Sequence, residues 1–169
     1  VKVIHQVNKG LASARNTGIM NASDDYILFL DSDDTLEPNC VEKILEVFNT
    51  TDADIVAPSF RTFGTSQETV YLSPRPTLED FKTANRIGYF SMIKKSALLE
   101  CGGYSPRMVE GYEDYHLWHD LLSRGKSIAT VHEPLVLYRT KEKSMYTEAV
   151  GHHDKLMGQI RKDFPKVYA

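Results

Sequence analysis

A run of five apolar residues, Tyr26 to Leu30, is followed at once by three aspartates within four positions. An uninterrupted apolar run of this kind is typical of a strand that is buried on both faces of a sheet. The carboxylates of Asp31, Asp33 and Asp34 then crowd the point where the strand ends, and like charges this close repel one another. The chain is therefore expected to place a buried strand beside a strongly acidic sheet edge.

Periodic patterns around this strand predict an α/β fold. Residues 1–7 alternate apolar and polar side chains as a strand does, and residues 11–22 repeat apolar and small side chains at helical spacing. A second helix is expected from about Pro38, because proline fits a first helical turn, and residues 54–60 form another short strand. The order β-α-β-α-β predicts a mostly parallel central sheet flanked by helices.

The rest of the chain shows no repeat and no dividing linker, so residues 1–169 are interpreted as a single domain. Its expected elements are a polar loop over 61–87 with a short helix at 78–81, a strand over 88–95, a helix to Glu100, a helix over 112–124, strands over 128–132 and 135–139, and a final helix over 148–164.

The composition is that of a globular domain, with 41% hydrophobic and 25% charged residues in 169. The net charge of −3 gives no basic field, so no nucleic-acid partner is expected. No apolar run approaches the roughly 20 residues that cross a bilayer, so no transmembrane segment is expected. Cys40 and Cys101 form no disulfide framework. A cytoplasmic location is expected, with peripheral contact to the inner face of the membrane left open.

The three aspartates are candidate metal ligands. A divalent cation would relieve their repulsion, and Mg²⁺ and Mn²⁺ prefer oxygen ligands. The carboxyl ends of strands in open α/β sheets are also where ligands bind. The structural alternative is a solvated turn that caps the next helix, with Asp34 or Thr35 near its start.

Two chemistries use such a cluster. In sugar transfer, a cation bridges the diphosphate of a nucleotide sugar and stabilises the leaving group. The second chemistry is phosphoryl transfer. The segment from Phe29 to Thr35 resembles the first motif of the haloacid dehalogenase superfamily of phosphatases. That resemblance implies that Asp31 would be a nucleophile and Asp33 an acid/base.

A second acidic pair, Glu113 and Asp114, opens the helix expected over 112–124. The helix dipole favours acids at this position, which gives a purely structural reason for them. Sugar transfer with inversion needs one base to take the proton of the acceptor hydroxyl, and a carboxylate here would supply it. A haloacid dehalogenase-like enzyme would instead need a lysine and another acidic motif at later strand ends, and no convincing series is present.

A series of short motifs runs in order through residues 8 to about 144. The motifs are Asn8-x-Gly10, Ala14-Arg15-Asn16-x-Gly18, Phe29-Leu30-Asp31-Ser32-Asp33-Asp34 with Pro38, Lys94-Lys95-Ser96, Gly102-Gly103-Tyr104, Gly111-Tyr112-Glu113-Asp114 and Pro134-Leu135-x-x-Tyr138-Arg139. Each is weak alone, but their order and spacing resemble family 2 of the inverting glycosyltransferases, which has the A-type nucleotide-sugar-binding fold.

On the donor side, the resemblance implies that Asp31, Asp33 and Asp34 hold a divalent metal, Mn²⁺ or Mg²⁺, together with the ribose-diphosphate part of the donor. Arg15, in the Ala-Arg-Asn motif, would contact the nucleotide. The family's first strand and the loop that cradles the nucleotide base are expected before Val1. The chain is thus interpreted as a catalytic domain that lacks its first strand.

On the acceptor side, the resemblance implies that Asp114 is the general base, with Glu113 beside it. The reaction would move a sugar from a nucleotide-diphosphate donor, with UDP as the expected nucleotide, to a hydroxyl of a saccharide or lipid-linked acceptor. A surface polysaccharide is the expected product. The apolar face of the final helix is compatible with packing on the domain or with a homo-oligomer.

Two further classes stay open from the sequence alone. A related nucleotidyltransferase would make a sugar nucleotide, but it would not need the acids at Glu113 and Asp114. A non-catalytic binding module would bind nucleotide without turnover.

Overall fold

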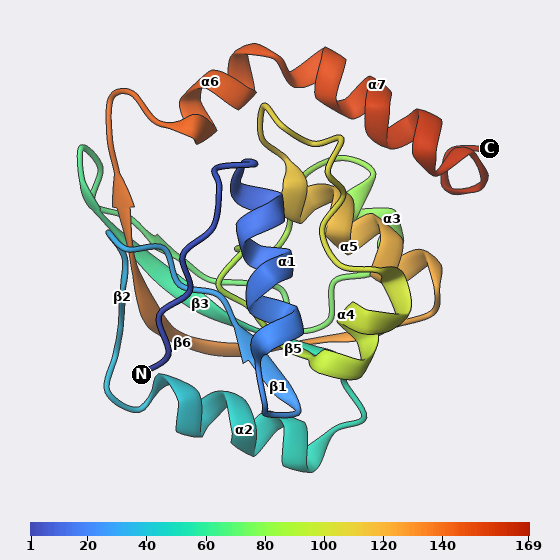
Figure 1. Cartoon of the computed structure of the whole chain (residues 1–169). Coiled ribbons are helices and arrows are strands. Elements are labelled where there is room, and N and C mark those ends of the chain that lie inside the picture. The colour runs from blue at the N-terminus through green and yellow to red at the C-terminus, as the bar shows by residue number, and fades with distance from the viewer.

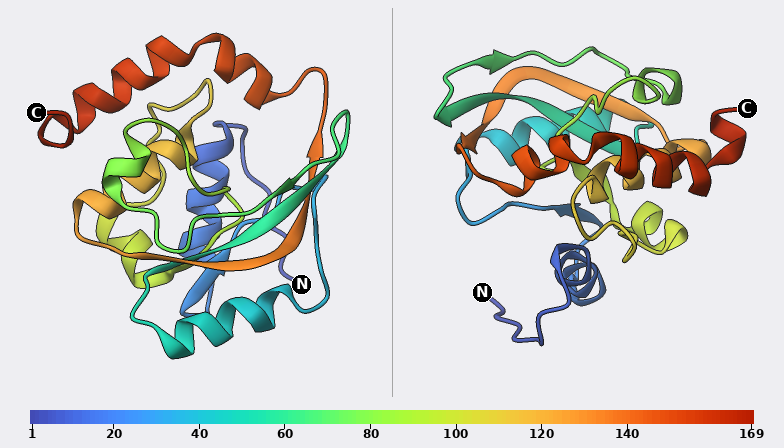
Figure 2. Two further views of the ribbon diagram at one scale, coloured as in Figure 1. Left: turned by 180° about the vertical axis from the view of Figure 1, so that it is seen from behind. Right: turned by 90° about the horizontal axis from the view of Figure 1, so that it is seen from above.

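The computed structural model describes residues 1–169 and places a curled sheet between helices on both faces (Figures 1 and 2). The helices are α1 (Leu11–Asn21), α2 (Cys40–Thr50), α3 (Leu78–Phe81), α4 (Lys95–Cys101), α5 (Glu113–Ser123), α6 (Met145–Gly151) and α7 (His153–Asp163), with a short 3-10 helix at Pro165–Val167. The strands are β1 (Tyr26–Leu28), β2 (Thr35–Leu36), β3 (Ile55–Gly64), β4 (Thr69–Val70), β5 (Met92–Lys94) and β6 (Ile128–Thr140).

The sheet is mixed, which corrects the expectation of a mostly parallel one. Its order is β1-β5-β3-β6-β2, with β4 paired to β3. Only β3 and β6 pair in parallel, and every other pair is antiparallel. A continuous apolar run does not report the direction of a strand. The expectation of a strand buried on both faces over residues 26–30 is also wrong: β1 covers only Tyr26–Leu28 at the edge of the sheet, and Tyr26 and Leu30 are exposed. The α/β class and the flanking helices are confirmed.

Two hydrophobic cores lie on opposite faces of the sheet, as the alternation of side chains along a strand requires. Val56 packs in the core that α2 covers with Ile44. Its neighbours Ile55 and Ala57 belong to the core on the other face, which includes Trp118 of α5. Full burial of each such side chain contributes about 1.5 to 3 kcal/mol. These two cores fix the strands whose ends carry the acidic residues.

Residues 1–10 contain no helix or strand, so the prediction of a strand at 1–7 is wrong for this structure. The segment has no ladder partner and instead contacts α1 through side chains. The Lys2 ammonium donates to Asn21 Oδ1 at 2.8 Å, and the Thr17 hydroxyl donates to Gln6 Oε1 at 2.5 Å. An alternating pattern alone therefore did not make a strand here.

The two strands predicted after residue 128 are one strand, β6, because β3 accompanies it from end to end. The register shifts between Pro58 and Phe60 of β3, where Val131 and Pro134 are successive partners on β6. His132 and Glu133 are the extra residues of β6 at the first shift, and Leu135, between Pro134 and Val136, is the extra residue at the second. Pro134 thus lies between the two register shifts, and β6 continues past it to Thr140.

The predicted final helix is divided into α6 and α7 at His152, whose φ of −109° and ψ of 19° leave the helical region. Both helices run across the end of the domain above α1 and α5 (Figure 1). Gly111 allows α6 to approach closely, since a Cβ at this position would lie 2.6 Å from Ala149 Cβ. None of the helices combines the length and the apolar character that crossing a membrane requires.

Two of the sequence motifs lock together through Asn16. Its amide nitrogen donates to the Tyr104 carbonyl at 2.9 Å, and its Oδ1 accepts from the Tyr104 amide at 2.8 Å. Gly103 has a φ of +77°, and a Cβ there would lie 2.4 Å from Asn16 Oδ1. Gly102 has a similar φ of +80°, but a Cβ there would meet nothing within 4 Å. A side chain at either glycine would strain the backbone, but only a side chain at Gly103 would also collide with Asn16.

We predict that Gly103→Ala destabilises the fold more than Gly102→Ala. Both changes should cost about 1 to 2 kcal/mol because an L-residue is strained at positive φ. Gly103→Ala should cost about 1 to 2 kcal/mol more, because it displaces Asn16 from its hydrogen bonds to Tyr104. Urea unfolding curves of the two variants measure the difference. Equal midpoints would show that the Asn16 contact contributes nothing.

Candidate active site

The acidic segment Asp31–Asp34 forms a turn that links β1 to β2, in which the Asp34 amide donates to the Asp31 carbonyl at 3.1 Å. Both carboxylate oxygens of Asp34 are engaged. Oδ1 accepts from the Arg139 amide at 2.7 Å, and Oδ2 accepts from the Tyr89 hydroxyl. Burial raises the pKa of Asp34, which is half-buried. This aspartate is therefore built into the turn.

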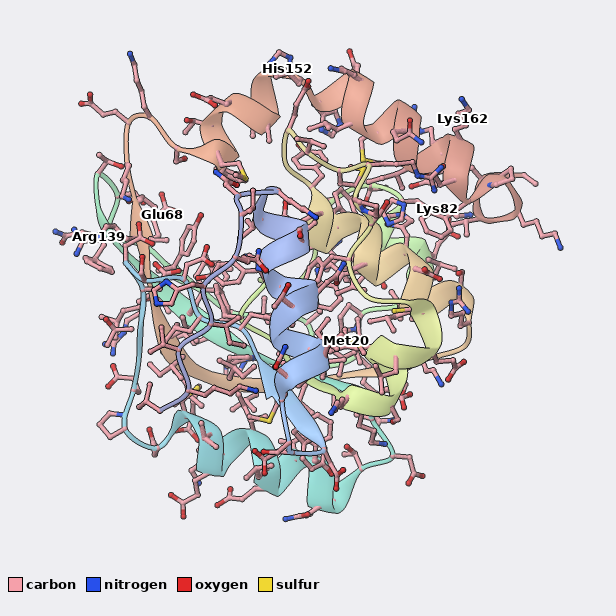
Figure 3. All side chains as sticks on the ribbon, in the orientation of Figure 1. Met20, Glu68, Lys82, Arg139, His152 and Lys162 are labelled. Atoms are coloured by element: carbon pink, nitrogen blue, oxygen red, sulfur yellow. The ribbon has the colours of Figure 1, made fainter.

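Asp33 lies beside the carboxyl end of β6. Its carboxylate pairs with Lys141 Nζ at 2.5 Å, and 37% of its side chain is exposed. Its carbonyl accepts from Arg139 Nε at 3.3 Å, and Arg139 is labelled in Figure 3 at this end of the strand. The hydrogen bond from Lys141 is the main cause that lowers the pKa of Asp33. Asp33 is thus an ionised, accessible carboxylate, and the positively charged side chains of Lys141 and Arg139 lie beside it.

Arg15 of α1 connects the two acidic segments. Its Nη2 lies 3.2 Å from Asp31 Oδ1, and its Nη1 lies 2.7 Å from Glu113 Oε1. Only 6% of the Arg15 side chain is exposed. Its guanidinium carbon lies 4.7 Å from the ring centroid of Tyr89 and 5.3 Å from that of Tyr104. Residues far apart in sequence are therefore held together by one buried cation.

The buried bridge bears on the predicted nucleotide contact of Arg15. Both terminal nitrogens of its guanidinium, Nη1 and Nη2, already donate hydrogen bonds to Glu113 and Asp31. The guanidinium thus orients Asp31, and only a small part of its own surface is exposed. Direct contact with a nucleotide stays a prediction.

The second acidic pair opens α5 after a tight backbone turn. Tyr112 adopts a left-handed conformation with a φ of 59°, and Gly111 before it has a φ of 120°. Asp114 Oδ2 accepts from the side-chain amide of Asn85 at 3.0 Å, and Oδ1 accepts from the backbone amide of Tyr115 at 2.8 Å. Burial, and next the charge of Glu113, raise the pKa of Asp114 to about 7. Asp114 is thus poised to exchange a proton near neutral pH.

A cleft of about 350 Å³ brings the candidate residues Arg15, Asp31, Glu113 and Asp114 together. Its other lining residues are Leu11, Thr83, Ala84, Asn85, Tyr89, Gly111, Tyr112, Tyr115, Tyr138, Met145, Tyr146, Ala149 and His153. Asp33 and Asp34 are not in this lining.

Sequence reasoning missed Tyr89 and Asn85, which orient the acids, and Tyr146 of α6, which lines the cleft. Tyr89 and Asn85 come from segments without a motif, and no pattern in the sequence marked them. Tyr146 lies before the start predicted for the final helix. Only the tertiary arrangement brings these side chains to the aspartates.

The three aspartates do not converge on one point. No set of three or more histidine, cysteine, aspartate or glutamate side chains is placed to ligate a single cation. Mg²⁺ commonly takes one or two protein carboxylates and completes its shell with phosphate oxygens and water. Asp33 is accessible, and Arg15 contacts only one carboxylate oxygen of Asp31, so these two carboxylates fit that smaller role.

Comparisons with known proteins identify the family of this chain. The model of the family described as glycosyl transferase family 2 matches residues 1–116. An uncharacterized glycosyltransferase of Haemophilus influenzae is 31% identical, covering 96% of this chain and 58% of the relative. Glycosyltransferase GlyG of Streptococcus pneumoniae is 28% identical, covering 86% of this chain and 54% of the relative. The chain thus spans little more than half the length of these two relatives.

Solved structures show the same fold at low sequence identity. The crystal structure of S. aureus TarS 1-349 in complex with UDP-GlcNAc matches with a TM-score of 0.69 and 12% identity, covering 85% of this chain and 43% of that chain. The complex of the same protein with UDP gives a TM-score of 0.66 and 13% identity, covering 93% and 52%. The A-type glycosyltransferase fold is confirmed, and the family match makes this chain a member of glycosyl transferase family 2.

Proposed function

We propose that this chain forms the catalytic domain of a metal-dependent inverting glycosyltransferase that uses a UDP-linked sugar. One observation carries the proposal: Arg15 holds the donor-side Asp31 and the acceptor-side Glu113 in one cleft, next to Asp114. Two acidic segments in one cleft match a reaction that has a leaving group on one side and a base on the other. The UDP complexes of TarS, which has the same fold, support the choice of nucleotide.

On the donor side, Asp33 and Asp31 would hold a divalent cation, Mn²⁺ or Mg²⁺, together with the diphosphate. When bound, such a cation offsets the negative charge of the departing diphosphate. Lys141 and Arg139 lie beside Asp33 and add positive charge at the same place. Asp34 would keep the turn in shape, because its oxygens are bonded to Tyr89 and Arg139.

On the acceptor side, Asp114 would take the proton of the acceptor hydroxyl as that oxygen attacks the anomeric carbon. The bond between the anomeric carbon and the diphosphate oxygen breaks at the same time, and UDP leaves with the bonding electrons. The partners of Asp114 in the structure are the neutral groups Asn85 Nδ2 and Tyr115 N, so its carboxylate is not neutralised by a direct ion pair. Glu113 is paired with Arg15 instead and is less suited to be the base.

The acceptor is proposed to be a saccharide or lipid-linked saccharide, with a surface polysaccharide as product. The resemblance to the family supports this proposal, and the cleft that residues of α5 and α6 line gives an acceptor a place beside Asp114. The phosphatase alternative is less consistent with the structure, since its nucleophile, Asp31, is paired with Arg15. A phosphatase mechanism that uses Asp31 and Asp33 also gives no role to Asp114, whose pKa is raised to about 7.

We predict that UDP binding depends on Mn²⁺ and on Asp33. Asp33→Ala should abolish the gain in UDP affinity that Mn²⁺ produces, because it removes one of the two accessible carboxylates proposed as ligands. Calorimetric titration of UDP with and without Mn²⁺ measures this gain. Asp24→Ala, which removes the same charge from an exposed turn, is the control and should bind as wild type does. A metal-dependent gain that survives in Asp33→Ala would contradict this assignment.

We also predict that turnover falls as the pH drops below about 7, because Asp114 must be deprotonated to act as a base and its pKa is raised to about 7. In the limit, kcat/KM should fall about tenfold per pH unit. Asp114→Asn should lower kcat by about a hundredfold or more and remove this dependence. Release of UDP from UDP-sugars measures both effects.

Asp120→Asn is the matched control for Asp114→Asn. Asp120 lies on the same helix and pairs with Arg124 outside the cleft, so its loss should leave turnover and the pH profile unchanged. A pH profile that stays the same in Asp114→Asn would exclude Asp114 as the base.

A further inference from the structure

Tyr89 is fixed by a tight turn rather than by a helix or strand. Ser91 donates to the Gly88 carbonyl from its amide at 3.1 Å and from its hydroxyl at 2.7 Å. Gly88 leaves room for the Phe90 ring, since a Cβ there would lie 2.3 Å from Phe90 Cζ. The Tyr89 ring packs against Phe90 with centroids 5.3 Å apart and against Tyr138 of β6 at 6.5 Å. The ring therefore has little freedom to move.

The hydroxyl of Tyr89 closes the acidic turn from inside. It donates to Asp34 Oδ2 and accepts from the Asp31 amide at 3.1 Å. A tyrosine hydroxyl has one proton to donate, and here that proton goes to a carboxylate. Burial, and next the bond to Asp34, raise the pKa of Tyr89, so the hydroxyl keeps its proton at any physiological pH. One atom thus ties the first and last residues of the turn together.

The ring of Tyr89 also supports Arg15. The guanidinium carbon of Arg15 lies 4.7 Å from the Tyr89 ring centroid, within the range of a cation–π contact. Only 9% of Tyr89 is exposed, and its side chain forms part of the cleft wall. The same side chain thus contacts the donor-side turn and the cation that leads to Glu113.

We infer that Tyr89 is a positioning residue that holds the Asp31–Asp34 turn in the shape in which Asp31 and Asp33 face a metal-bound diphosphate. This inference rests on the proposed function. Tyr89 does not contact the reacting atoms in this account, and it acts through the two ends of the turn. Asp34 is then the anchor to which Tyr89 is bonded, whereas Asp33 is paired only with the half-exposed Lys141 at the surface and can exchange that partner for the cation.

Tyr89→Phe tests the inference, because it keeps the ring under Arg15 and removes only the hydroxyl. Tyr168→Phe is the matched control: it removes another tyrosine hydroxyl, which hydrogen-bonds to His119 Nε2 at 2.7 Å and is not in the cleft. UDP is titrated calorimetrically into wild type and both variants, with and without Mn²⁺, and each melting temperature is recorded. The Mn²⁺-dependent gain in UDP affinity should fall about tenfold in Tyr89→Phe and stay unchanged in Tyr168→Phe.

If Tyr89 served only to stabilise the fold, Tyr89→Phe would lower the melting temperature and leave the Mn²⁺-dependent gain in UDP affinity intact, and this result would overturn the inference. Wild type without any Mn²⁺-dependent UDP binding would overturn the proposed function, and the inference with it. If Tyr89→Phe does not fold, Asp34→Asn removes the charged acceptor of the same hydrogen bond and should lose the same gain. Asp34→Asn with an undiminished gain would show that this hydrogen bond does not position the turn.

Discussion

The ion bridge of Arg15 is the interaction on which the site depends. A guanidinium removed from water is costly unless its charge is compensated, and two carboxylates from distant parts of the chain provide that compensation. Asp31 follows β1, and Glu113 begins α5, so the bridge can form only when α1, the sheet and α5 have all packed. The rings of Tyr89 and Tyr104 beside the guanidinium keep water away from it. The cleft is thus a direct consequence of the tertiary packing.

The bridge also divides the work between neighbouring acids. Glu113 is paired with Arg15, whereas Asp114, the next residue, has only neutral hydrogen-bond donors and a raised pKa. On the donor side, Asp34 is bonded on both oxygens and Asp33 remains accessible. Adjacent residues of the same type thus have different environments, which is how a site assigns different proton and ligand roles to similar groups.

Much of this could be predicted from the sequence, because several signals were local. The apolar run ending at Asp31, the helix beginning at Glu113 and the order of the motifs led to the correct fold class and family. Strand directions could not be predicted, since an apolar run carries no information on direction, and the run at residues 26–30 even forms an edge strand that is partly exposed. The role of Arg15 as a bridge and the hydroxyl of Tyr89 were also beyond the sequence, because each depends on partners that are distant along the chain. Whether Asp33 binds metal stays a prediction.

A double-mutant cycle on Asp31→Asn and Glu113→Gln, followed by urea unfolding, tests most directly whether one buried cation unites the two acidic segments. Each single variant leaves Arg15 with one carboxylate, whereas the double variant leaves a buried charge without compensation. The account predicts that the double variant loses at least about 1 kcal/mol more than the sum of the single losses. Additive losses would contradict it, and the two acidic segments would then be independent.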